Sequence, residues 1–162
     1  MRRLLVPVLA LVLTPTAGAT FTYTVETSSP VTAPGITLSG DDQSKTFSIV
    51  TRVANTSFGD TGGWKVQASA TTPTSGSHTL PALTVTAGSY ACYSSCTVNP
   101  TQTGVSYPIT LSTTAQTIYN ANSRTGEGTF NVTSTFQVTY PASAILGTYS
   151  STVTITAATG PT

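Results

Sequence analysis

Charged residues are scarce in this chain of 162 residues, at 7% of the sequence against an average of about 25%. Outside the first three positions the basic residues stand singly, at Lys45, Arg52, Lys65 and Arg124. A protein that binds nucleic acid usually carries a basic stripe or patch on one face. The sequence therefore predicts that nucleic acid is not a partner, and that hydroxyl groups of serine and threonine supply most of the polar surface.

Residues for catalysis and metal binding are equally few. The single histidine, His78, lies in the turn-like segment 75–79 with no acidic neighbour, whereas a serine or cysteine nucleophile needs a histidine base held by a carboxylate. Three of the five acidic residues, Asp41, Asp42 and Asp60, lie in turns, where aspartate commonly bonds the nearby backbone. We therefore expect a protein that is not an enzyme, with no cofactor and no bound metal.

Long hydrophobic runs are absent. The most apolar stretch, Leu4 to Leu13, has about ten residues, and a membrane-spanning helix needs roughly 20. It follows Arg2 and Arg3 and precedes Ala17-Gly18-Ala19, which is the order of a secretory signal. The sequence predicts a signal peptide over residues 1–19 and one domain over residues 20–162. Without Arg2 and Arg3 the mature chain has four basic and five acidic residues, a net charge of −1.

There are only two cysteines, Cys92 and Cys96. Export to an oxidising compartment favours a disulfide between them. The alternative, a zinc site, needs four ligands, which two cysteines and one histidine do not provide. We expect the disulfide to fix a tight hairpin rather than to hold the whole fold together, because the closed loop is short.

Alternation of apolar and hydroxyl residues dominates the rest of the chain, with no apolar pattern of helical period, and it predicts half-buried strands. The strongest runs are Thr20–Glu26, Phe47–Val53, Trp64–Ala70, Phe130–Tyr140 and Tyr149–Ala157, with shorter candidates at 82–86, 107–111 and 116–119. Segment 94–117 is expected to be an extended excursion. Short strands between turn clusters predict an antiparallel β-sandwich of immunoglobulin-like or related topology, closed by a hairpin of Gly128–Tyr140 with Gly147–Ala157. Thr20–Glu26 could pair with its own sheet or with that of a neighbour.

The single tryptophan, Trp64, has two interpretations. It has the same parity as Val66, Ala68 and Ala70, so all four lie on one face of a strand, and this favours a place in the core. The alternative is an exposed platform that stacks on a sugar ring.

Trp64 also follows the glycine-rich turn 59–63, and the C-terminal run holds Tyr149, Val153, Thr154, Ile155, Thr156, Ala157 and Pro161 in one register. In these two motifs the chain resembles the WxL family of bacterial cell-surface domains. Val66, Ile155 and Ala157 stand where that family has Leu, Trp and Leu. The resemblance implies a secreted, non-catalytic domain that associates non-covalently with the cell wall (peptidoglycan). It implies Trp64, Val66, Tyr149, Thr154, Ile155, Thr156 and Pro161 as the binding residues.

The sequence thus indicates a location outside the cell or on its wall, with a cell-wall polymer or other surface proteins as partners and no membrane span after signal removal. The alternative function is a structural subunit of an extracellular fibre or surface layer assembled by β-strand complementation, in which Thr20–Glu26 or another edge strand completes the sheet of a neighbour.

We predict that the exported protein begins at or near Thr20, because the charged start, apolar stretch and small-residue site occur in the order that the secretory machinery reads. Mass spectrometry of the protein recovered outside the cell will show this N-terminus. Recovery of the full-length chain in the membrane fraction would contradict it.

Overall fold

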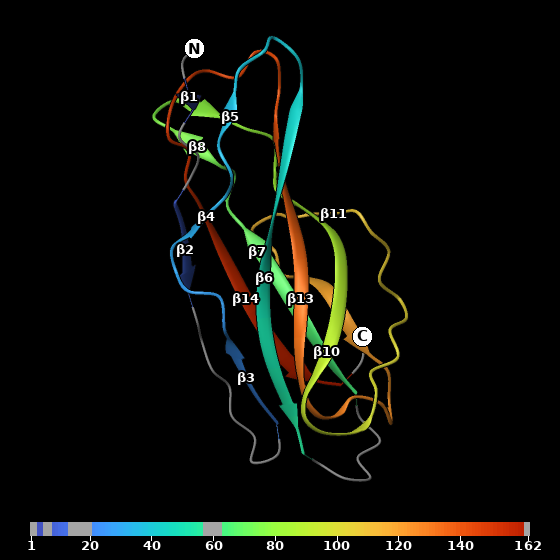
Figure 1. The fold of residues 1–162 in the computed structure, drawn as a ribbon. Helices are drawn as coiled ribbons and strands as arrows, with labels where there is room; N and C mark the ends of the chain where they lie inside the picture. Colours follow the sequence, from blue (N-terminus) through green and yellow to red (C-terminus); the bar gives the residue numbers. More distant parts are fainter. Residues whose placement is uncertain (1–2, 5–7, 13–20, 57–62, 161–162) are drawn as a thin grey trace.

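Two five-stranded sheets pack against each other (Figure 1). The computed structural model describes residues 3–4, 8–12, 21–56 and 63–160, the first two segments as backbone only. All secondary-structure elements in these residues are strands. The described residues therefore contain no helix that is long and apolar enough to cross a membrane. The predicted all-β sandwich is confirmed.

Sheet I contains, in spatial order, β11 (Ile109–Thr110), β10 (Thr84–Val98), β13 (Glu127–Tyr140), β6 (Gln43–Asn55) and β3 (Phe21–Val25). Sheet II contains β12 (Gln116–Ala121), β7 (Trp64–Ala70), β14 (Ser151–Thr159), β2 (Val8–Val12) and β4 (Val31–Thr32). Two short ladders join β1 (Arg3–Leu4) to β5 (Ile36–Thr37) and β8 (Thr74–Ser75) to β9 (His78–Thr79).

The β6–β13 pair is the long axis of sheet I (Figure 1). Its antiparallel register runs without a shift from Gln43 opposite Tyr140 to Asn55 opposite Gly128. Along β13 the even-numbered residues are buried and the odd-numbered residues are half-buried. This two-residue alternation is the one that the sequence predicts, because successive side chains of a strand point to opposite faces.

The core lies between the inner faces of the two sheets. Sheet I contributes Phe130 and Phe136 from β13, and sheet II contributes Val66 from β7 and Ile155 from β14, all fully buried. The odd parity predicted for the C-terminal strand is confirmed, since Tyr149, Val153, Ile155 and Ala157 are all buried.

The predicted hairpin of Gly128–Tyr140 with Gly147–Ala157 is wrong. β13 lies in sheet I, where β10 and β6 already pair with its two edges. β14 therefore crosses to sheet II and pairs with β7. Both strands were recognised from their alternation, but the pairing depends on which edges the rest of the chain leaves open.

The structure also bears on two other segments. The strand at Phe21–Val25 pairs antiparallel with β6 of its own chain, which is the first of the two arrangements expected for it. Segment 94–117 belongs in part to the sandwich, because β10 continues to Val98 and β12 begins at Gln116.

The apolar stretch of the predicted signal contains a strand of sheet II. Val8–Val12 forms β2 and runs parallel to β14, with Ser151 opposite Leu9 and Thr154 opposite Val12. On its other side β2 pairs antiparallel with β4. This is the one parallel pairing among the described strands.

Candidate functional site

The two motifs that carry the family resemblance lie on neighbouring strands. β7 and β14 pair antiparallel, with Thr159 opposite Trp64 and Thr156 opposite Gln67. Trp64 and Val66 come from β7, and Thr154, Ile155 and Thr156 come from β14. Tyr149 directly precedes β14, and its hydroxyl donates to the carbonyl of Ile145 at 2.9 Å. Pro161 lies outside the described residues.

Most of these motif side chains are inaccessible from outside the molecule. Trp64, Val66 and Ile155 are 0% exposed and Tyr149 is 1% exposed. Thr154 and Thr156 point the other way and are half-buried. In this structure the apolar motif residues fill the core, so of the described motif residues a polymer bound at the surface would reach only the two threonines.

The indole of Trp64 packs among groups from both sheets. Its ring stacks on Tyr119 of β12 at 5.6 Å between centroids and lies tilted against Phe130 of β13 at 6.5 Å. The indole N–H donates to the carbonyl of Gly126 at 2.9 Å. Burial raises the pKa of Tyr119, so its phenol stays neutral beside the indole. The core interpretation of Trp64 agrees with this environment.

Gly126 is a partner of Trp64 that the sequence did not reveal. Its φ is +73°, and a Cβ at this position would lie 2.4 Å from the indole nitrogen. Only glycine combines this conformation with so close an approach. Its position in a polar turn, 62 residues from Trp64, gave no sign of the contact.

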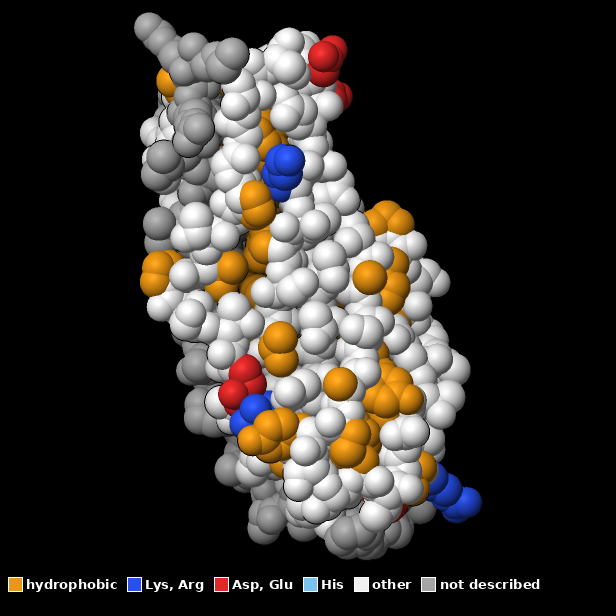
Figure 2. Space-filling view, viewed as in Figure 1, with side chains coloured by type: hydrophobic (Ala, Val, Ile, Leu, Met, Phe, Trp, Pro, Cys, Tyr) orange, Lys and Arg blue, Asp and Glu red, His pale blue; other side chains and the backbone are white. Residues whose placement is uncertain are grey.

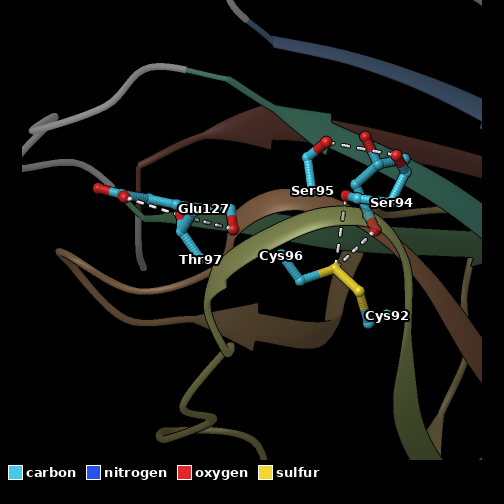
Figure 3. The surroundings of a disulfide bond; sticks show 7 residues. Cys92, Ser94, Ser95, Cys96, Thr97 and Glu127 are labelled. Carbon is cyan, nitrogen blue, oxygen red and sulfur yellow. Dashed lines mark hydrogen bonds between the residues drawn. A yellow bond between two sulfur atoms is a disulfide. The ribbon is translucent and has the colours of Figure 1, made fainter.

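Cys92 and Cys96 form a disulfide, with their Sγ atoms 2.00 Å apart (Figure 3). The expectation that it closes a hairpin is wrong, because both cysteines lie within β10. The ladder with β13 shifts register between Cys92 and Ser94 and again between Ser94 and Val98. The disulfide therefore closes a bulged part of one strand.

The bulge lies close to the start of β13. Cys96 Sγ is 3.2 Å from the carbonyl oxygen of Thr129, a contact without a hydrogen bond because a disulfide sulfur carries no proton. A Cβ on Gly128 would lie 2.6 Å from the Cys96 Cα and from the Ser95 carbonyl oxygen. Ser95 itself has a φ of +51°. The absent Gly128 side chain is what allows the bulge to approach β13.

Tyr93 is the extra residue of this bulge, since Cys92 faces Phe130 and Ser94 faces Thr129 in the ladder. A bulge re-aims the side chain of its extra residue. The Tyr93 ring reaches across β13 to β6, where the Arg52 guanidinium carbon lies 3.6 Å from the ring centroid. Tyr93 is 56% exposed, the largest exposed fraction among the exposed large hydrophobic residues of the described chain.

Three groups hold the Arg52 side chain in this position. Its Nη1 lies 3.2 Å from Glu26 Oε1, its Nε donates to Asn131 Oδ1 at 3.2 Å, and the Tyr93 ring covers the guanidinium. We call Glu26, Arg52, Tyr93 and Asn131 the Tyr93 patch. It gathers residues from β10, β13 and β6 and the end of β3 on the outer face of sheet I.

This patch cannot be read from the sequence. Arg52 stands there as a single basic residue, and Tyr93 lies between the two cysteines with no other distinguishing feature. Its residues span positions 26 to 131 in the sequence. The Cys-x₃-Cys spacing was the one local signal, because it brackets Tyr93.

The surface around the patch is almost free of charge. Most of the face in Figure 2 is white with scattered orange hydrophobic side chains, and few acidic or basic groups appear on it, one red and one blue group lying together. On β13 the outward residues around Asn131 are Thr129, Thr133 and Thr135, all half-buried. Such a flat face offers hydroxyl and amide groups for hydrogen bonding, and it avoids the cost of removing charges from water.

Titratable groups also lie outside the Tyr93 patch in the described part of the chain. His78 is exposed on β9. Asp42 accepts a hydrogen bond from the backbone amide of Ala142 at 2.7 Å, which ties the entry of β6 to the link after β13. Across residues 21–56 and 63–160, no group of three or more His, Cys, Asp and Glu is placed to hold a metal ion.

Comparison of the chain with protein-family models, with curated proteins and with solved structures gives no match in any of the three. The WxL resemblance thus remains a hypothesis that rests on the motif residues themselves.

We predict that Trp64→Ala lowers the free energy of unfolding by about 3 to 5 kcal/mol, as is typical for truncation of a buried aromatic side chain. Trp64→Phe keeps a ring against Tyr119 but loses the bond to Gly126, and will cost less. Chemical denaturation of both variants measures the difference. A melting curve of Trp64→Ala that overlays the wild type would show that the indole does not support the core.

Replacement of both Cys92 and Cys96 by serine should cost about 2 kcal/mol at most, because closing a loop of a few residues restricts the unfolded chain little. Urea unfolding of oxidised protein, reduced protein and the double variant will show it, with the reduced wild type as the matched control. A loss of several kcal/mol would mean that the bulge nucleates or braces more of the fold than its contacts with β13 indicate.

Proposed function

We propose that this chain is an exported, non-catalytic surface module that associates non-covalently with a cell-wall polymer through the Tyr93 patch. One observation carries the proposal: a bulge places an aromatic ring on an otherwise hydroxyl-rich face, and Arg52 holds the ring there. Most of the residues that carry the WxL resemblance are buried. In this proposal they stabilise the sandwich that presents the Tyr93 patch and do not contact the polymer themselves.

The patch has the chemistry that recognition of a glycan requires. The electron-rich face of an aromatic ring attracts the C–H groups of a sugar, as it attracts other positively polarised groups. Arg52 covers Tyr93 from one side, and Tyr93 remains 56% exposed. The amide of Asn131 and the charged ends of Arg52 and Glu26 lie beside the ring and can bond sugar hydroxyl or carboxylate groups.

The disulfide has a positioning role in this proposal. It closes the bulge on both sides of Tyr93, so it limits the directions that the ring can take. A ring held in place before binding loses less conformational entropy when the ligand arrives. The bridge can therefore matter more for affinity than for stability.

A second candidate function is a structural subunit of an extracellular fibre or surface layer assembled by strand addition. The observation that favours it is the parallel pairing of β2 with β14. This pairing makes the completion of sheet II depend on the segment that export is expected to remove.

We predict that Tyr93→Ala reduces sedimentation of the protein with purified insoluble cell wall by roughly tenfold, the equivalent of about 1.4 kcal/mol. Its melting temperature should fall by only about 1 to 4 °C, since the exposed side chain loses little beyond its contact with Arg52, worth about 0.5 to 1 kcal/mol. Tyr93→Phe keeps the aromatic face and should retain most of the binding.

The matched control is Ile145→Ala, which truncates another exposed apolar residue, 50% accessible and located in the link between β13 and β14. It should bind as the wild type does. Equal sedimentation of all four proteins would remove the Tyr93 patch from the proposal, and failure of the wild type to sediment with any wall preparation would reject wall association.

A further inference from the structure

Export with cleavage after residue 19 would remove strand β2 from the interior of sheet II. This inference rests on the export that is part of the proposed function. β2 is flanked by β14 on one side and β4 on the other, with Leu9 opposite both Ser151 and Val31. Removal of residues 1–19 would therefore take out an internal strand and leave a slot one strand wide. Extended edges with unpaired backbone groups are templates for strand addition.

The backbone of β14 shows which groups would face the slot. The Thr152 amide donates to Thr71 Oγ1 at 2.9 Å, and the Thr152 carbonyl accepts from the Thr71 amide at 3.0 Å, both on the side of β7. Backbone groups alternate in direction along a strand. The amide and carbonyl groups of Ser151 and Val153 therefore point toward β2, and those of Ile155 point to the same side, just past the end of β2 at Val12.

Val31 of β4 and Ser151 of β14, which both lie opposite Leu9 of β2, also line a small apolar cavity. Its walls come from both sheets and include Val31, Ala33, Phe47, Leu83, Val138 and Ser151. Val31 and Ser151 are the two residues that flank Leu9. A strand in the slot therefore pairs with two residues that also line this small apolar cavity.

We propose that in the exported protein this slot binds an extended apolar segment of a different polypeptide, which runs parallel to β14 and completes sheet II. The donor bonds the main-chain groups of Ser151, Val153 and Ile155 and runs beside the apolar cavity. The occupant seen here, Val-Leu-Ala-Leu-Val, defines the chemistry of the donor: at least four consecutive residues, extended and uncharged.

A second copy of this chain does not fit the slot. Its first strand after the predicted cleavage site, Phe21–Val25, already pairs with β6. Two β14 edges related by a two-fold axis would pair antiparallel, whereas the slot holds a parallel strand. The β4 segment on the far side also limits the space to a single strand.

The test uses the full chain with a specific protease site inserted between Ala19 and Thr20. After cleavage and removal of the released segment, amide hydrogen exchange at Val153 and Ile155 should accelerate at least about tenfold, while Thr152 and Thr154, whose amides face β7, stay slow. A synthetic peptide of residues 4–13 with terminal lysines should restore the slow exchange. At about one hundred times its dissociation constant it should raise the melting temperature by about 5 to 10 °C.

The matched control is the same peptide with Leu9→Asp and Leu11→Asp, which should restore neither property. If the cleaved chain unfolds and only the apolar peptide refolds it, the slot is equally supported. The proposal would be overturned if adding the apolar peptide to the cleaved chain left the exchange rates of the Val153 and Ile155 amides unchanged. It would also be overturned if these amides became protected without peptide, through dimerisation that increases with protein concentration. Retention of residues 1–19 in the exported protein would overturn it too. Wall sedimentation of the same samples reports on the Tyr93 patch separately, so either proposal can fail alone.

Discussion

The burial of Trp64 is the constraint on which the rest of the structure depends. The indole extends from sheet II, stacks on Tyr119 of the same sheet and contacts Phe130 of sheet I. Its N–H is satisfied by the Gly126 carbonyl, so a large side chain with one polar atom enters the core at little cost. Because Gly126 directly precedes β13 and Gly128 lies beneath the disulfide bulge, the same short segment also sets the position of Tyr93.

The sequence predicts those features of the fold that depend on neighbouring residues, and it does not predict those that depend on residues far apart in the chain. The alternation in β13 and β14 is a local property, and it correctly gave the strands and their buried faces. Pairing is a property of the whole chain: β13 has β10 and β6 at its edges, which only the complete sheet reveals. A hairpin was the natural expectation for consecutive strands, since most sequential strands are neighbours.

The candidate site was harder to predict for a similar reason. The motif residues were assigned to binding by resemblance, whereas the structure buries Trp64, Val66, Tyr149 and Ile155. Tyr93 gains its exposed position from a shift in the β10–β13 register. A bulge of this kind depends on the close approach of Gly128 in another strand, and no pattern around Tyr93 encodes it.

The topology of sheet II also has a consequence for how the chain folds. Its neighbours β2 and β14 come from opposite ends of the sequence, so the sheet cannot close until the last strand has been synthesised. Such non-local pairing makes folding slow and leaves unpaired edges exposed meanwhile. While the edges of sheet II stay open, other extended segments have time to pair with them.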